Sequence, residues 1–264
     1  VSPSEIYDST TYTKGREVFR TLQTYLDLLI PDGFRKAQNL YFSRYDGQAV
    51  TFRELLQSAN EILLEAQSPD LSQFERWFNQ QGTPQILAQV GFDKQARRLT
   101  LTLEQSCPHP KTGADQPPLL IPFTYEFLRL DGRSATGKQT LILTDKVHTI
   151  QIPAEEKLIP IFLHDYGAPV ILNYPYTSSE LAIIMRCATD PFTAWEAGQN
   201  FHLLAMQKAD FRPMAAQIKA ALEEKSLSAL AKAQLLSLPS LRTMSERFAE
   251  FDFPKLQKLR DRYK

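Results

Sequence analysis

The hydrophobic pattern of this chain changes period twice, and these two changes constrain the fold more than any other feature. Apolar residues recur at helical spacing up to Pro84, alternate with polar residues from there to Tyr176, and then return to helical spacing. Helices are therefore expected over about 1–84 and 177–264. The alternating region, 85–176, contains about six or seven short strands separated by turn residues, which is typical of a β-sandwich.

Local start and stop signals refine this division. The segments 51–54 and 177–180 both read Thr-x-x-Glu, the pattern of a capping box in which hydroxyl and carboxylate satisfy backbone amides at a helix start. A further helix capped by Asp70 is expected to bury Trp77, and Trp195 is expected in the core of a later helix. The last helices are short and closely connected, which predicts an α-solenoid of helix pairs.

Composition excludes several classes of function. The 30 basic and 30 acidic residues balance, so the chain has no electrostatic footprint for nucleic acid or for an anionic membrane surface. No window approaches the roughly 18 apolar residues of a membrane span. Cys107 and Cys187 are the only cysteines, which fits neither a disulfide framework nor a metal knuckle and favours a cytoplasmic location.

The residues alone do not form a complete active site. A catalytic zinc needs about three protein ligands, often including two histidines one helical turn apart. The four histidines are His109, His148, His164 and His202, and no two of them form such a pair. Each is interpreted as an ordinary surface or core residue, and no metal site is predicted in this chain.

Three successive stretches nevertheless resemble one enzyme family when taken together. They are "YDSTTYTKGREVFRTL", "YFSRYDGQAVTFRELLQSANE" and "DLSQFERWFNQQGTPQ". Their order closely resembles the zinc metalloaminopeptidases of the aminopeptidase N type, especially the large bacterial alanyl aminopeptidases. The later stretch "YPYTSSELAIIMRCATDPFTAWEAGQ" looks like the passage of that family from its β-sandwich into its C-terminal helical domain.

The resemblance implies a division into domains and a set of site residues. It identifies 1–84 with the helical end of a thermolysin-like catalytic domain, 85–176 with a β-sandwich and 177–264 with the start of a solenoid-like helical domain. Tyr12 matches the catalytic tyrosine of the family's Tyr-x-Lys-Gly motif, whose hydroxyl stabilises the tetrahedral oxyanion. Tyr7 matches a position that lines the substrate pocket. From the residues alone, the simpler interpretation is that Tyr12 fills the core.

The family's His-Glu-x-x-His helix, its zinc-ligand glutamate and its Gly-x-Met-Glu-Asn loop do not occur in the sequence. The chain is therefore expected to be an internal fragment. Its parent would use zinc to remove N-terminal amino acids from peptides. The fragment alone is expected to be inactive, to hold no zinc and to self-associate through surfaces that truncation exposes.

Two other interpretations stay open at this point. One is a non-catalytic scaffold that keeps the aminopeptidase architecture, although the retained Tyr12 argues for the enzyme. The other is a free-standing β-sandwich interaction module flanked by helices, which the match across residues 74–84 disfavours.

Overall fold

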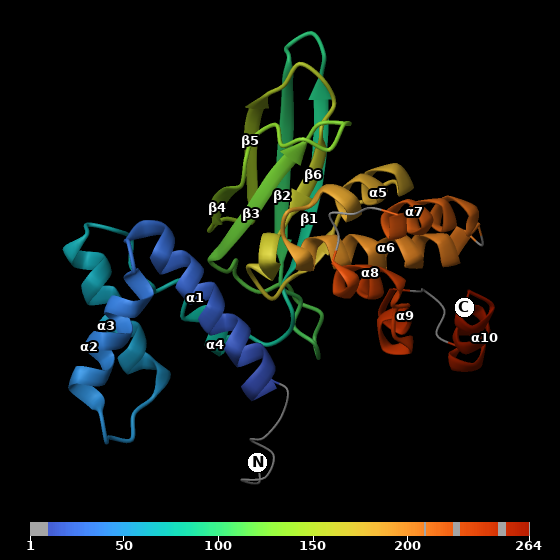
Figure 1. The fold of residues 1–264 in the computed structure, drawn as a ribbon. Coiled ribbons are helices and arrows are strands. Elements are labelled where there is room, and N and C mark those ends of the chain that lie inside the picture. The colour runs from blue at the N-terminus through green and yellow to red at the C-terminus, as the bar shows by residue number, and fades with distance from the viewer. Residues whose placement is uncertain (1–9, 209, 224–227, 248–251, 264) are drawn as a thin grey trace. The chain divides into compact units, whose positions relative to one another are not determined.

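A computed structural model describes residues 10–208, 210–223, 228–247 and 252–263 (Figure 1). The helical elements are the π-helical turn η2 (Thr10–Lys14), α1 (Gly15–Leu29), α2 (Gly33–Tyr45), α3 (Phe52–Glu65), α4 (Arg76–Asn79), the 3₁₀ turn η3 (His164–Tyr166), α5 (Ser178–Cys187), α6 (Pro191–Lys208), α7 (Arg212–Glu223), α8 (Ala229–Leu236), α9 (Leu241–Arg247) and α10 (Phe253–Tyr263). The strands are β1 (Gln85–Asp93), β2 (Arg98–Ser106), β3 (Ile121–Leu128), β4 (Gln139–Leu143), β5 (Val147–Pro153), β6 (Ile159–Phe162) and β7 (Ile171–Asn173). The predicted order of helices, sandwich strands and helices, and with it the α+β class, is confirmed.

The chain divides into two compact units. The first takes the chain up to Tyr125 together with Lys138–Lys157 and Gly167–Tyr174. The second takes Glu126–Gly137, Leu158–Tyr166 and the chain from Pro175 onward. Each unit is described by itself below.

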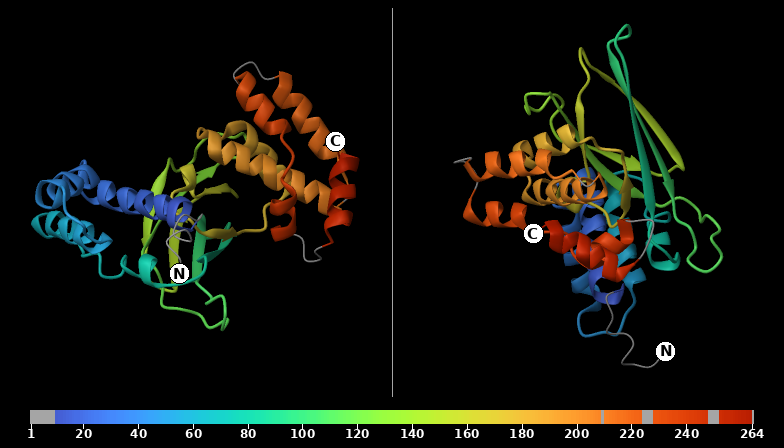
Figure 2. Two further views of the ribbon diagram at one scale, coloured as in Figure 1. Left: turned by 90° about the horizontal axis from the view of Figure 1, so that it is seen from below. Right: turned by 90° about the vertical axis from the view of Figure 1, so that its right-hand side faces the viewer.

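The strands form two sheets, with the orders β5-β2-β1-β7 and β4-β3-β6. The long hairpin of β1 and β2 is antiparallel, pairing Gln85 with Ser106 at its open end (Figure 1; Figure 2, right). Leu99, Leu101 and Leu103 on β2 are buried, and the residues between them are less so. The alternation in the sequence therefore marks one inward face of this sheet.

Capping residues predict two helix starts in the first unit, and one of the two forms as expected. The capping box before α3 forms as predicted: Thr51 N–H donates to Glu54 Oε2 at 2.8 Å, and Thr51 Oγ1 accepts from Arg53 N–H. The helix predicted from Asp70 is wrong in length, because α4 is a single turn and the residues before it form other turns. Asp70 instead accepts from the N–H of Ser72, which closes a local turn.

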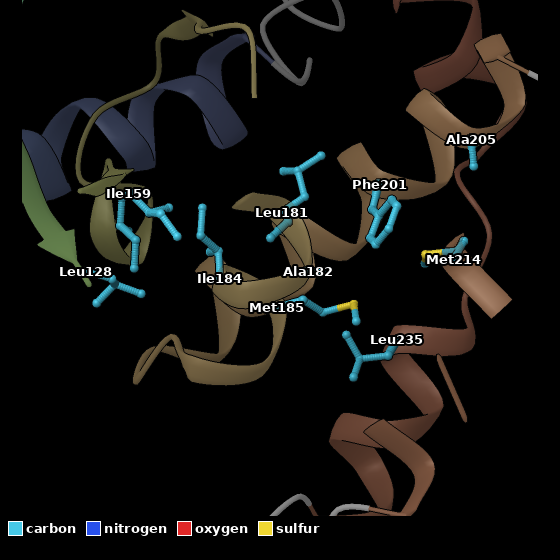
Figure 3. Close-up of a cluster of buried hydrophobic side chains, with 12 residues drawn as sticks. Leu128, Ile159, Leu181, Ala182, Ile184, Met185, Phe201, Ala205, Met214 and Leu235 are labelled. Atoms are coloured by element: carbon cyan, nitrogen blue, oxygen red, sulfur yellow. The ribbon is translucent and has the colours of Figure 1, made fainter. Parts of the chain in front are cut away.

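The second unit packs α5 and α6 around a common apolar core (Figure 3). The predicted capping box before α5 is present between Thr177 and Glu180. On α6 the side chains of Ala197, Phe201 and Ala205 face the cluster. Trp195 lies near the start of α6, before the residues that face the cluster. It is 36% exposed, so the prediction of a buried Trp195 is wrong.

Among the helices that the described residues form, none has the length and the apolar content needed to cross a membrane.

Candidate functional site

Tyr12 lies in the π-helical turn η2, directly before the first long helix. Its side chain is 58% exposed, so the interpretation that it fills the core is wrong. A phenol at such a position can donate a hydrogen bond to a bound molecule. Tyr7, the predicted pocket residue, lies outside the described residues.

The start of α1 has no side-chain cap. Lys14 precedes the helix with φ −65° and ψ −41°, so η2 runs into α1 without a change of backbone region. Glu17 lies in the first helical turn, where a negative side chain interacts favourably with the helix dipole. Leu22 and Leu26 are fully buried further along α1 and fix the helix in the first unit. The helix is therefore anchored by its buried face rather than by a cap.

Lys14 makes a long-range contact at this helix start. Its Nζ donates a hydrogen bond of 2.7 Å to the carbonyl oxygen of Gly82. Both residues belong to motifs that the sequence analysis singled out, the Tyr-x-Lys-Gly and the Gly-Thr-Pro stretches. Each motif can be recognised in the sequence, but the contact between the two cannot.

A cluster of ionisable side chains, which the sequence analysis did not predict, lies inside the second unit. His164 Nε2 is 3.4 Å from Glu126 Oε2, and His164 Nδ1 is 3.7 Å from Asp190 Oδ2. Asp190 also accepts from the N–H groups of Phe192 and Thr193 at the start of α6. The three ionisable side chains are buried, so a substrate cannot reach them. We therefore assign the cluster a role in the stability of the fold.

The remaining histidines do not join this cluster. His202 is buried on α6 with Nε2 3.0 Å from the carbonyl oxygen of Leu235, and burial lowers its pKa against a smaller opposing effect of that hydrogen bond. His109 accepts backbone N–H groups within its own loop. Across the described part of the chain, no group of three or more His, Cys, Asp or Glu side chains could hold a metal ion. These residues therefore do not fit a zinc site.

Three family models match successive parts of the sequence. Residues 1–77 match the Peptidase family M1 domain. Residues 82–175 match a Domain of unknown function (DUF3458) with an Ig-like fold, and residues 178–264 match a Domain of unknown function (DUF3458_C) described as ARM repeats. The three matches follow the order of helices, sandwich and helices in the structure.

Curated relatives and solved structures agree with these matches. Aminopeptidase N of Escherichia coli is 30% identical over 96% of this chain, and that of Caulobacter vibrioides is 32% identical over 97%. The chain spans about 30% of the length of these relatives. Legionella pneumophila aminopeptidase A, solved in complex with aspartic acid, superposes with a TM-score of 0.84 over 97% of this chain and 29% of its own, at 23% identity. That last likeness concerns the fold alone.

Proposed function

We propose, since this chain belongs to the aminopeptidase N family, that it is part of a zinc-dependent aminopeptidase that removes N-terminal amino acids from peptides. In this proposal Tyr12 donates a hydrogen bond to the oxyanion that forms when the peptide carbonyl is attacked. The observation that carries the proposal is the exposed Tyr12 side chain at the start of α1, within a segment that matches the M1 domain. Tyr7 is proposed to line the pocket for the substrate.

The role of Tyr12 predicts a particular kinetic result. In the full-length protein, Tyr12→Phe should lower kcat for an alanine anilide by about two orders of magnitude with KM nearly unchanged, because the hydrogen bond is strongest in the transition state. Tyr45→Phe, which removes a hydroxyl from the end of α2, is the matched control. Turnover that survives in Tyr12→Phe would return Tyr12 to a structural role and contradict its part in stabilising the oxyanion.

We propose that zinc is held by residues of the whole protein outside the described part of this chain. The histidines here are dispersed over a loop, a strand, a 3₁₀ turn and a helix, which supports this view. The 264-residue chain alone should then neither hydrolyse an alanine anilide nor retain zinc after dialysis. One tightly bound zinc per chain, or turnover above a blank, would contradict the proposal.

An aromatic groove on the first unit supports the proposal that the isolated chain self-associates. The groove has a volume of about 490 Å³ and its lining includes Phe19, Phe34 and the 58%-exposed Phe42. Exposed apolar surface of this kind favours association with a second copy. Sedimentation of the chain should show dimers or larger species, and Phe42→Ser should reduce them. An unchanged monomer in both proteins would refute this.

We propose two further properties of this chain, its domain boundaries and its location in the cell. We place the domain boundaries after Pro84 and after Tyr176, where the helical and strand regions meet. We also propose a cytoplasmic location, because Cys107 and Cys187 are both free cysteines and thiols stay reduced in that compartment.

A further inference from the structure

The lysine two positions after Tyr12 connects the start of α1 to a distant part of the first unit. The hydrogen bond from Lys14 Nζ to Gly82 O spans 68 residues of the chain. The Lys14 side chain is half-buried, and its donor is charged, which makes such a bond stronger than one between neutral groups. The bond therefore restricts the turn from which Tyr12 projects.

The accepting carbonyl is itself held in place. Gly82 has φ +99°, a conformation that residues with a side chain rarely adopt. A Cβ at this position would come within 2.7 Å of the carbonyl oxygen of Pro108. Glycine is thus required here for two reasons, and the backbone of Gly82 lies directly against the loop 107–116.

The same loop holds the carbonyl of the preceding residue. Gln116 Nε2 donates to Gln81 O and, at 2.9 Å, to Cys107 O, while Cys107 Sγ lies 3.6 Å from Gln81 O. The loop is closed on itself, because Cys107 N–H donates to Asp115 Oδ1 and Lys146 Nζ binds Asp115 Oδ2, both at 2.9 Å. These bonds make the loop a fixed support.

The Lys14 charge also acts on a side chain of the loop 107–116. Burial raises the pKa of the Cys107 thiol, and the positive charge of Lys14 works in the opposite direction. The ammonium group is thus close enough to act on a side chain of the loop.

We propose that Lys14 is a positioning residue for Tyr12, and that the loop 107–116 of the β-sandwich region is the support against which it holds the start of α1. This inference rests on the proposed function, because it acts through the Tyr12 hydroxyl. A donor to a developing oxyanion has to be held within about 0.5 Å of its productive position. Lys14 contributes by restricting the turn, without touching the substrate.

The test compares five variants of the full-length protein: Lys14→Met, Lys14→Arg, Tyr12→Phe, the double variant Tyr12→Phe/Lys14→Met and the exposed control Lys36→Met. We expect Lys14→Met to lower kcat for alanine p-nitroanilide by about tenfold at nearly constant KM, because small displacements of a catalytic group are costly. In the Tyr12→Phe background the same substitution should change kcat by less than about twofold, since no hydroxyl remains to be positioned. Lys36→Met should resemble the wild type, and Lys14→Arg, which can still donate to Gly82 O, should recover most of the loss.

Several outcomes would overturn the inference. A Lys14→Met enzyme with wild-type kcat would do so, and so would losses that multiply fully in the double variant. If Tyr12→Phe keeps the wild-type kcat, the proposed function fails and the inference fails with it. If Tyr12→Phe lowers kcat but Lys14→Met does not, only the positioning role is refuted. If Lys14→Met does not fold, Lys146→Met tests the support from the other side of the loop: we expect kcat to fall about threefold, and a wild-type kcat would overturn the inference.

Discussion

The two helical regions of this chain bury their apolar residues in different ways. In the second unit, α6 has buried residues on all sides, from Thr193 to Met206, as expected of a central helix surrounded by others. In the first unit, α1 buries one face and leaves the groove around Phe19 and Phe42 open. The same helical period thus produces a self-contained core in one region and a partly uncovered surface in the other. Tyr12, the proposed catalytic residue, belongs to the uncovered region.

This difference predicts the largest effect on stability. Phe201 is 2% exposed in the core of the second unit, whereas Phe42 is 58% exposed in the first. Phe201→Ala should lower the free energy of unfolding of its unit by about 3–5 kcal/mol, because the buried ring atoms are lost and a cavity is left in the core. The matched change Phe42→Ala should stay within about 0.5 kcal/mol.

Urea unfolding followed by tryptophan fluorescence can separate the two units. Trp77 is buried in the first unit and Trp195 is partly exposed in the second, so their emission should differ in wavelength. Equal destabilisation by the two alanine substitutions would contradict the conclusion that the two helical regions bury their apolar residues differently.

The buried cluster around His164 predicts the next largest effect. His164→Phe removes the group between Glu126 and Asp190 and leaves two buried carboxylates with fewer partners. We expect the second unit to lose about 1–3 kcal/mol of unfolding free energy. His148→Phe on β5, where the ring is only half-buried, should change stability by less than about 0.5 kcal/mol. A His164→Phe protein as stable as the wild type would show that the cluster is dispensable.

Sequence reasoning worked where the determinants are local. Both capping boxes are set by residues three positions apart, and both form. It failed for Trp195 because the burial of each residue on α6 depends on the elements that pack around the helix, which lie elsewhere in the sequence. It also missed the bonds of Lys14 with Gly82 and of His164 with Glu126, whose partners are distant in the chain. No local pattern encodes such pairs.

The acid sensitivity of the second unit should be smaller and should come from His202. Burial lowers the pKa of His202, whereas a histidine in the unfolded chain titrates near about 6.5. Below that pH the unfolded state binds a proton that the folded state resists, so the stabilisation is full above pH about 6.5 and is lost as the pH falls. For a single proton this loss cannot exceed about 1.4 kcal/mol per pH unit below that value.

Urea unfolding at pH 7.5 and pH 5.5 measures this loss, and His202→Gln should flatten the difference between the two. Because His202 belongs to the second unit, the Trp77 signal of the first unit should not show the same change. A parallel loss in both signals would argue that other groups cause it.

The smallest expected effect is a difference in the reactivity of the two cysteines, which also tests the positioning of Tyr12. Cys107 is buried beside Gly82 with a raised pKa, whereas Cys187 is half-buried in the second unit. Because the thiolate is the reacting species and Cys107 is the more buried thiol, Cys107 should be alkylated by iodoacetamide at pH 8 more slowly than Cys187. Lys14→Met removes the positive charge that opposes the rise in pKa, so it should slow Cys107 further and leave Cys187 unchanged. If the substitution instead speeds alkylation of Cys107, the junction has opened, which would mean that Lys14 holds the loop closed more than it tunes the thiol. Mass spectrometry of the two peptides over time separates these results.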